Sequence, residues 1–448
     1  MKKLIQNIKN IFAIEELRRR ILNTLILLLV FRIGAHIVLP GIDPTKIATK
    51  SGAAKGLLDL LNTFLGGAFQ NVAIFALGIM PYISASIAVQ LLTVALPNFQ
   101  KMQKEGDSGR KKLTQITKYL TIIFTIVQSY AYLQNPDVLG AVRPEVGIGY
   151  FTISSIMILT AGTMFCMWLG DRITDRGIGN GVSMLIMIGI VSRFPQAIIL
   201  EVTARFGKKA AIGGPFLLLI EFVLLFFIVL LVVMFTQAIR RIPVQYAKQV
   251  VGNKVYGGQR QYIPLKLNTS GVMPIIFAQS LMFLPSLLAG LFKGNESAQA
   301  VVNMFSNQFG WQYNLIFAFM ILIFTYFYTA ITINPKQIAD DMKRNGGFIP
   351  GVKPGDPTSE YIDSVLSKIT LPGALFLAVI AVLPSVVRVT MDVDMIFAGF
   401  FGGTSLLIMV GVVLDTLQQI ESYLLMKHYE GLMESGKISD TSNMAMVQ

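Results

Sequence analysis

The chain has 448 residues, of which 53% are apolar and 14% are charged, and its formal net charge is +13. Soluble globular proteins carry about 25% charged residues, so the composition excludes a single water-soluble enzyme core, and its apolar content excludes disorder. One cysteine excludes a disulfide framework, a zinc cluster and an iron–sulfur centre, and two histidines leave little for metal chemistry. We therefore expect no metal and no cofactor.

Ten stretches could cross a bilayer, which requires about 20 mostly apolar residues each. Six are clear candidates: Ile21–Leu39, Tyr150–Leu169, Phe216–Phe235, Leu315–Ile333, Ile369–Val387 and Ile396–Thr416. Four are interrupted by Pro, Gly, Ser or Gln: Val72–Leu96, Thr117–Leu133, Val182–Leu200 and Ser270–Leu291. The segment 56–69 is amphipathic and too short to cross, which indicates a re-entrant or half helix. The sequence thus predicts an all-α polytopic membrane protein with ten transmembrane helices.

The lysines and arginines predict the orientation of these spans, because cytosolic segments carry the excess of both residues. With the N-terminus in the cytosol, 27 of the 38 basic residues fall in cytosolic segments, 10 fall outside, and Arg32 lies within the first span. This split favours an even number of spans and places the N-terminal segment 1–20 and the C-terminal tail 421–448 in the cytosol.

Two of the weak spans begin with similar motifs. Gly78-Ile79-Met80-Pro81 opens one, and Gly271-Val272-Met273-Pro274 opens the other. Each motif lies in the second span of a five-span half, 21–200 or 201–420, and an odd number of spans gives the halves opposite orientations. Inverted repeats typically place a substrate path at the midplane between the halves. The alternative is that both motifs are ordinary helix starts with proline in the first turn.

Polar side chains in the weak spans admit two interpretations. The residues concerned are Ser84, Ser86, Gln90, Gln279 and Ser280. Spans with such residues face other helices or water rather than lipid. Ordinary helix packing explains any single serine, whereas clustering in the spans that carry the repeat favours a pore.

Motifs of common enzymes do not occur. The chain has no GxxxxGK[ST] phosphate loop, no HExxH, no GxSxG and no CxxC. The glycine-rich string 177–181 follows a charged turn, 171–176, rather than a strand, and it suits a tight reversal and a helix start. The sequence therefore predicts that the protein is not an enzyme.

Two cytosolic loops, 237–268 and 334–368, are basic and contain proline and glycine. Positive-inside bias alone would explain their charge, but orientation requires only a few charges close to the spans. Their length instead favours binding to an anionic partner, either RNA or an acidic protein face.

Six segments, taken in order, resemble one family almost from end to end. They are GGAFQNVAIFALGIMPYISASIAVQLL (66–92), DRITDRGIGNGVSMLI (171–186), RRIPVQYAKQ (240–249), PLKLNTSGVMPIIFAQS (264–280), NPKQIADDMKRNGGFIPGVKPGDPT (334–358) and FGGTSLLIMVGVVLDTLQQIESYL (401–424). They resemble the SecY/Sec61-alpha family of protein-conducting channel subunits. Two positions differ from the family pattern, Lys353 and Gln249, where family members have arginine. A lysine offers a point charge rather than a planar fork.

The resemblance implies two inverted halves around a central hourglass pore with a lateral gate. It assigns an apolar pore ring to Ile83, Ile87, Val182, Ile186, Ile276 and Ile408. It assigns a plug to the segment 56–69, with Leu57, Leu58, Leu61, Phe64, Leu65, Gly66 and Gly67. It places the lateral gate between spans 2 and 3 (72–96 and 117–133) on one side and spans 7 and 8 (270–291 and 315–333) on the other. The polar residues at this gate are Ser84, Ser86, Gln90, Gln279 and Ser280.

The implied function is passage of unfolded secretory polypeptides across the plasma (inner) membrane, with sideways release of hydrophobic segments into lipid. The implied partners are the small subunits SecE and SecG, the SecA motor ATPase, the ribosome, signal peptides and nascent chains, and the bilayer. Motor or ribosome binding would fall on Arg240, Arg241, Lys248, Lys254, Arg260, Arg344 and Lys353. Two other hypotheses stay open from the residues alone, an ion-coupled secondary transporter of a small solute and a membrane-bound scaffold.

Overall fold

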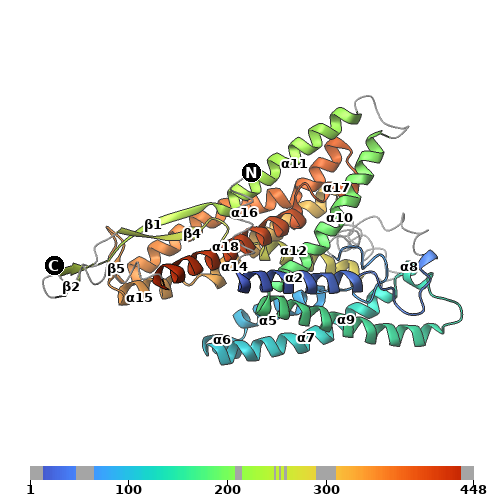
Figure 1. Ribbon diagram of the computed structural model, residues 1–448, viewed down its shortest axis with the longest axis horizontal. Coiled ribbons are helices and arrows are strands. Elements are labelled where there is room, and N and C mark those ends of the chain that lie inside the picture. Colours follow the sequence, from blue (N-terminus) through green and yellow to red (C-terminus); the bar gives the residue numbers. More distant parts are fainter. Residues whose placement is uncertain are drawn as a thin grey trace. The chain divides into compact units, whose positions relative to one another are not determined.

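The structure, a computed structural model, describes residues 14–46, 65–206, 214–246, 249–251, 254–256, 260–288 and 309–434. This part of the chain is mostly helical (Figure 1). The helices in chain order are α2 (Glu15–Gly34), α5 (Met80–Ala95), α6 (Pro97–Lys104), α7 (Asp107–Leu133), α8 (Pro136–Leu139), α9 (Ile148–Arg176), α10 (Gly181–Phe206), α11 (Gly214–Gln237), α12 (Met273–Leu288), α14 (Trp311–Thr332), α15 (Pro335–Arg344), α16 (Asp356–Met391), α17 (Met395–Ala398) and α18 (Gly403–Glu434).

Six helical stretches in the described ranges are long and apolar enough to cross a membrane. Five are the single helices α9, α10, α11, α16 and α18, and the sixth is α14 continued by α15. A seventh results if α5 and α6 count as one broken span, since they meet at 105°. The break falls at Pro97, and Leu96 before it is extended, as the ring of a following proline favours. The chain is therefore a multi-pass membrane protein.

Several helices begin or end away from the predicted spans. α5 begins at Met80 rather than Val72, because residues 65–79 form successive turns. Part of this region pairs with the chain after α2: Val38 and Ala73 form an antiparallel bridge. α7 begins ten residues before the predicted Thr117, and α16 extends on both sides of the predicted span. Hydropathy marks the apolar stretch of a helix, whereas backbone hydrogen bonding continues beyond it.

The first long loop, 237–268, contains strands, so the prediction of an all-α chain is incomplete. β1 (Ile239–Tyr246) pairs antiparallel with β4 (Arg260–Lys266) and with β5 (Gly347–Phe348) of the second loop, and the sheet order is β4-β1-β5 (Figure 1). A separate pair joins β2 (Gln249–Val251) to β3 (Lys254–Tyr256). On β1, the β-branched residues Ile242 and Val244 are buried and alternate with exposed residues, as expected for a strand with one face on a core.

The described residues divide into two compact units. One contains the residues up to Arg193 and those from Gly411 onward, and the second contains Phe194–Val410. α10 and α18 each contribute residues to both units along the chain.

In the first unit, α7 packs against α5 and α9 through a polar stripe. Thr117, Thr121, Thr125 and Ser129 recur every four residues, and all are buried. The hydroxyl of Thr121 donates to the Thr117 carbonyl at 2.7 Å, and that of Thr125 donates to the Thr121 carbonyl at 2.6 Å. Small hydroxyl side chains let helices approach closely in a membrane. Helix packing therefore explains the weak hydropathy of this span.

In the second unit, a buried ion cluster fixes the end of α10. Arg205 Nε lies 2.8 Å from Glu201 Oε1, and its Nη2 lies 2.6 Å from Glu221 Oε1 on α11. The same Nη2 donates to the Met391 carbonyl at 2.8 Å, and Glu201 Oε2 accepts the Asp394 N–H at 2.8 Å. The two glutamate side chains are 2% and 0% exposed. One guanidinium thus joins α10, α11 and the chain that follows α16.

We expect Arg205→Met to destabilise the protein by about 3–5 kcal/mol, because it leaves two buried carboxylates without their cation. The melting temperature of the purified protein in detergent measures this loss. The control is Arg19→Met, which breaks an exposed pair with Glu15 and should change stability by no more than about 1 kcal/mol. Equal melting temperatures for the two variants would show that the cluster contributes nothing to stability.

Candidate functional site

Four of the predicted ring residues lie in the first unit. Ile83 and Ile87 are buried on α5, at 7% and 6% exposure, and their four-residue spacing puts them on one face. Ile186 on α10 is buried at 7%, and Val182, one turn earlier, is half-buried. Pro81 lies in the first turn of α5, where the missing N–H of proline breaks no helix hydrogen bond.

The other two ring residues lie in the second unit. Ile408 on α18 is 2% exposed, whereas Ile276 on α12 is half-buried and its neighbour Ile275 is fully buried. Ring membership of these six residues stays a prediction.

The turn between α9 and α10 is the glycine-rich string that the sequence singles out. Its N–H groups bind side chains of three helices: Ile178 N–H donates to Thr24 Oγ1 at 3.0 Å, and Gly179 N–H to Gln419 Oε1 at 2.8 Å. Gly181 N–H donates to Thr174 Oγ1 at 2.9 Å. A side chain at Gly181 would collide with a backbone carbonyl of α9. The expected tight reversal and helix start are confirmed.

The turn segment, residues 65–70, precedes the turns that lead into α5. Leu65 is 4% exposed, and Gly66 and Gly67 have φ of +61° and +95°, which side-chain-bearing residues rarely adopt. The predicted plug residues Leu57, Leu58, Leu61 and Phe64 lie outside the described residues.

Three side chains from other helices hold the turn segment. Arg32 Nη1 on α2 donates to the Gly66 carbonyl at 2.6 Å, and the Tyr132 hydroxyl on α7 donates to the Phe69 carbonyl at 2.7 Å. The third side chain is Arg193 on α10, which contacts the segment near its end. The sequence alone did not predict these roles, although an arginine inside the first span was a visible signal.

The predicted gate residues on α5 form local contacts within their own helix. Ser84 donates to the Met80 carbonyl one turn earlier at 3.2 Å, and Gln90 Nε2 lies 3.5 Å from Ser86 Oγ. On α12, Gln279 is buried, and Ser280 is half-buried. These contacts agree with helix packing, so the lateral gate stays a prediction.

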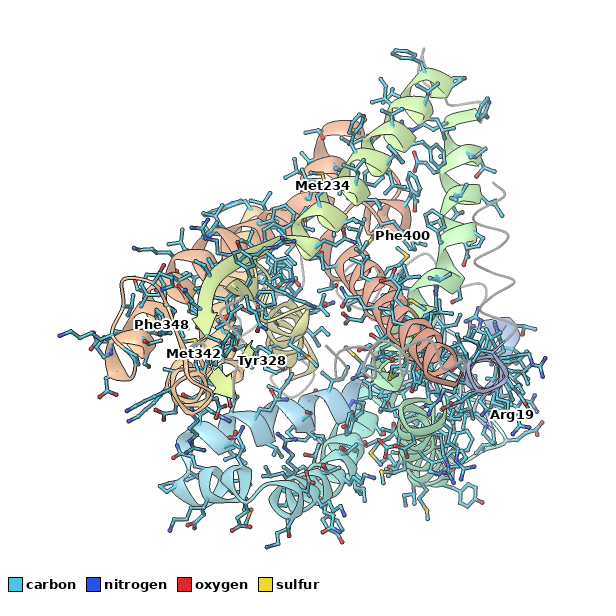
Figure 2. All side chains as sticks on the ribbon, turned by 60° about the vertical axis from the view of Figure 1, so that its left-hand side comes forward. Arg19, Met234, Tyr328, Met342, Phe348 and Phe400 are labelled. Carbon is cyan, nitrogen blue, oxygen red and sulfur yellow. The ribbon has the colours of Figure 1, made fainter. Side chains whose placement is uncertain are left out.

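The two long loops, 237–268 and 334–368, share a hydrophobic core, and we call the folded unit that they form the loop domain. It consists of the β4-β1-β5 sheet, α15 and the start of α16. Its buried residues are Ile242, Val244, Leu265, Met342, Ile349, Ile362 and Leu366. Figure 2 labels Met342, which is buried, and Phe348 of β5, which lies on the exposed side. The loops therefore form a folded surface rather than loose connections.

Basic side chains project from this surface. Four of them are exposed: Arg240 and Arg241 on β1, Arg344 at the end of α15, and Lys353 in the tip of the second loop, residues 346–355. Lys248 lies outside the described residues, and for Lys254 and Arg260 only the backbone is described, in β3 and β4.

The tip that carries Lys353 has a defined backbone. Gly351 and Gly355 on either side of it have φ of +85° and +105°. The buried Thr358 hydroxyl donates to the Lys353 carbonyl at 2.8 Å. The tip thus presents Lys353 to solvent from a fixed turn.

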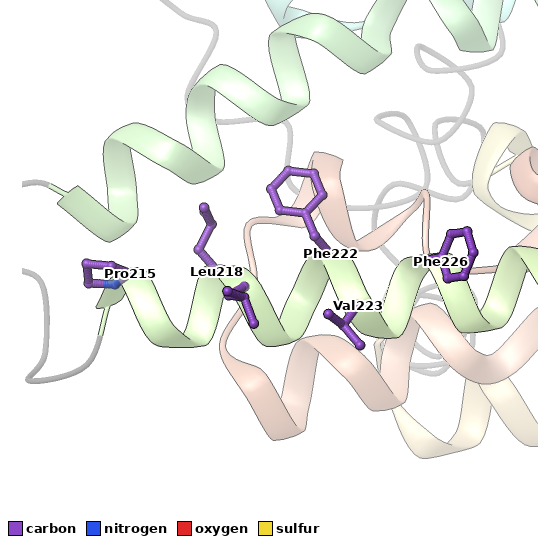
Figure 3. Close-up of a pocket in the computed structure, with 6 residues that line it drawn as sticks. Pro215, Leu218, Phe222, Val223 and Phe226 are labelled. Carbon is purple, nitrogen blue, oxygen red and sulfur yellow. The ribbon is translucent and has the colours of Figure 1, made fainter. Parts of the chain in front are cut away.

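A cavity of about 500 Å³ lies beside α11 and is lined by Pro215, Leu218, Leu219, Phe222, Val223 and Phe226. Figure 3 shows Leu218 and Phe222 pointing toward the neighbouring helix α10. It contains no predicted site residue. No cluster of three or more metal-ligating side chains occurs among the described residues.

The SecY family model matches residues 73–417, a range that includes the ring candidates, the glycine-rich turn and both loops. The chain belongs to the SecY family. It is 42% identical to protein translocase subunit SecY of Streptomyces galbus over 94% of this chain and 98% of the relative. It is 40% identical to protein translocase subunit SecY of Thermotoga maritima over 97% and 99% of the two chains.

Solved structures share the SecY-family fold at lower identity. A protein-conducting channel matches with a TM-score of 0.65 and 17% identity, covering 90% of this chain and 92% of the other. Sec61 in the canine ribosome-channel complex matches with a TM-score of 0.61, 16% identity and the same coverages. The yeast Ssh1 complex bound to the 80S ribosome matches with a TM-score of 0.57 and 14% identity, covering 92% and 89%.

Proposed function

We propose that this SecY-family chain is the channel subunit of a protein translocase and not an enzyme. It passes unfolded secretory polypeptides across the membrane and releases hydrophobic segments sideways into lipid. The observation that carries the proposal is the similarity to translocase subunits along nearly the whole of both chains. The location we propose is the plasma (inner) membrane, with both termini in the cytosol.

The architecture we propose has ten spans in two inverted halves, 21–200 and 201–420, around an hourglass pore. Ile83, Ile87, Val182 and Ile186 would line the constriction from one half, and Ile276 and Ile408 from the other. Burial of four of the six side chains supports this assignment. A narrow apolar ring excludes water and so blocks ions, while its side chains fit around a passing peptide.

The plug, 56–69, would cover this ring at rest, and the gate would open at the seam between spans 2 and 3 and spans 7 and 8. Ser84, Ser86, Gln90, Gln279 and Ser280 would make that seam weakly polar. A weakly polar seam separates at less cost than a closely packed apolar one, so a hydrophobic segment could partition through it into lipid.

The loop domain would bind the partner that drives transport. Its exposed Arg240, Arg241, Arg344 and Lys353 suit the phosphates of ribosomal RNA or an acidic face of the motor SecA. Ribosome-bound channel complexes among the structural neighbours support the first of these. SecE and SecG are the proposed small membrane subunits.

Reconstitution tests the function directly. We expect proteoliposomes that contain this chain with SecE and SecG to take up a preprotein when SecA and ATP are added, and to transport no small solute. The measurement is protection of the preprotein from external protease, with vesicles that lack the chain as the control. Solute uptake driven by an ion gradient without preprotein protection would instead support the secondary transporter.

Polar substitution in the ring should relax signal selectivity. We expect Ile83→Asn or Ile408→Asn to raise export of a preprotein with a defective signal sequence on the order of tenfold, because a hydrated ring favours the closed state less. The matched control is Leu219→Asn on α11, which replaces an exposed apolar side chain. Export at the level of the unsubstituted protein in both ring variants would remove these residues from the pore.

Charge reversal in the loop domain should weaken partner binding without affecting folding. We expect Arg240→Glu, Arg344→Glu and Lys353→Glu to reduce binding of SecA and of ribosomes and to flatten its salt dependence, since each removes a phosphate- or carboxylate-binding charge. Stability should change by no more than about 0.5 kcal/mol per exposed site.

Lys353→Arg should be tolerated, because it keeps the charge. Pull-downs at two salt concentrations measure these effects, with membrane abundance as the folding control. Unchanged binding of both partners to the Lys353→Glu variant would leave the tip with a structural role only.

A further inference from the structure

Two arginines bind the turn segment from different helices, α2 and α10. Arg32 Nη1 donates to the Gly66 carbonyl at 2.6 Å, and Arg193 Nη2 donates to Gln70 Oε1 at 3.3 Å. The contacts fall at the two ends of residues 65–70, so the segment is attached at both ends.

The segment also fits closely against these helices. A Cβ atom added to Gly66 would lie 2.8 Å from Ser192 Oγ, 2.9 Å from Arg32 Nη1 and 3.1 Å from the Gly189 backbone. A Cβ atom added to Gly67 would lie 3.2 Å from Arg193 Nη2. The two glycines therefore bring the backbone directly against both guanidinium groups.

Holding two oxygen atoms with charged donors carries a desolvation cost, because a guanidinium loses its hydration when it is buried. Arg193 is only 8% exposed, and Arg32, which is half-buried, forms no ion pair within the part of the chain that the structure describes. A buried guanidinium needs its hydrogen bonds, because nothing else replaces its lost hydration. The neutral hydroxyl of Tyr132 holds the Phe69 carbonyl in the same segment, so the turn does not by itself require charge.

The strength of such a contact depends on water. In a site without water, the guanidinium and the carbonyl find no other hydrogen-bond partners, so separating them costs free energy. Once water enters, both groups are solvated equally well, and the contact contributes little. A contact of this kind is stable while the site is dry and is lost when the site is hydrated.

We propose that Arg32 and Arg193 are positioning residues that hold the turn segment in the resting channel and release it when water enters; we call this pair the arginine hold. The proposal rests on the proposed channel function. It explains why two charged donors, in addition to the neutral hydroxyl of Tyr132, hold the segment that precedes α5. α5 is the helix that carries Ile83 and Ile87.

Accessibility of the segment tests the hold without any transport assay. Cys166 is the sole cysteine, so Cys166→Ser gives a background in which Ala68→Cys introduces a single thiol at a buried position of the segment. In proteoliposomes with SecE and SecG, we expect Arg32→Gln and Arg193→Gln each to raise the labelling rate by a membrane-impermeant maleimide, on the order of tenfold. The control, Arg143→Gln in an exposed outer loop, should leave the rate unchanged.

Conductance of the same proteins in planar bilayers supplies the second measurement. We expect higher resting ion conductance in both glutamine variants and in neither the control nor Arg32→Lys, which keeps a charged donor. Gln70→Ala removes one acceptor of Arg193 without changing either arginine, and it should raise labelling and conductance by a smaller factor. This variant keeps the test decisive if a glutamine variant does not accumulate.

Each remaining outcome contradicts a stated part of the proposal. Unchanged labelling in Arg32→Gln, Arg193→Gln and Gln70→Ala would overturn the hold itself. Faster labelling with unchanged conductance would overturn its link to the resting channel. Failure of the unsubstituted protein to translocate a preprotein would instead contradict the proposed function, and the labelling result would not depend on it.

Discussion

Inside a bilayer, every backbone N–H and C=O group needs a hydrogen-bond partner within the protein, because hydrocarbon offers none. Most of this chain meets that constraint with helices. The informative places are the irregular stretches that adjoin the spans, the turn segment 65–70 and the glycine-rich turn 177–181. Both are built from glycines that permit unusual backbone angles, and side chains of neighbouring helices satisfy their polar groups.

The same constraint explains which polar side chains the spans contain. The threonines of α7 satisfy their hydroxyls on their own helix, so a polar stripe can be buried where helices meet. Arg205 satisfies two carboxylates and a carbonyl at once. Arg32 and Arg193 differ from both cases, since they bind a carbonyl and an amide oxygen of a turn. A hydrogen bond from a guanidinium to such an oxygen weakens when water enters the site. This sensitivity suits the proposed release of the turn segment.

Outside the bilayer, the chain follows the rules of soluble proteins. The loop domain buries Ile242, Val244 and Met342 in a small core of its own and leaves its arginines and lysines exposed. A partner that drives transport needs a rigid surface, because a flexible loop would lose conformational entropy on binding. A folded loop domain therefore fits the proposed binding of a motor or a ribosome better than basic composition alone.

The sequence by itself determined the membrane class, the apolar helices, the family and the reversal at 177–181, because these depend on local composition and on motifs. It did not predict the strands of the loop domain, since β1 pairs with residues about 20 and 100 positions away and such pairing has no local signature. Nor did it identify Thr24, Gln419 or Arg193 as partners of turns. Those roles depend on which helices pack together, and only the tertiary structure decides where a distant side chain meets an irregular stretch of backbone.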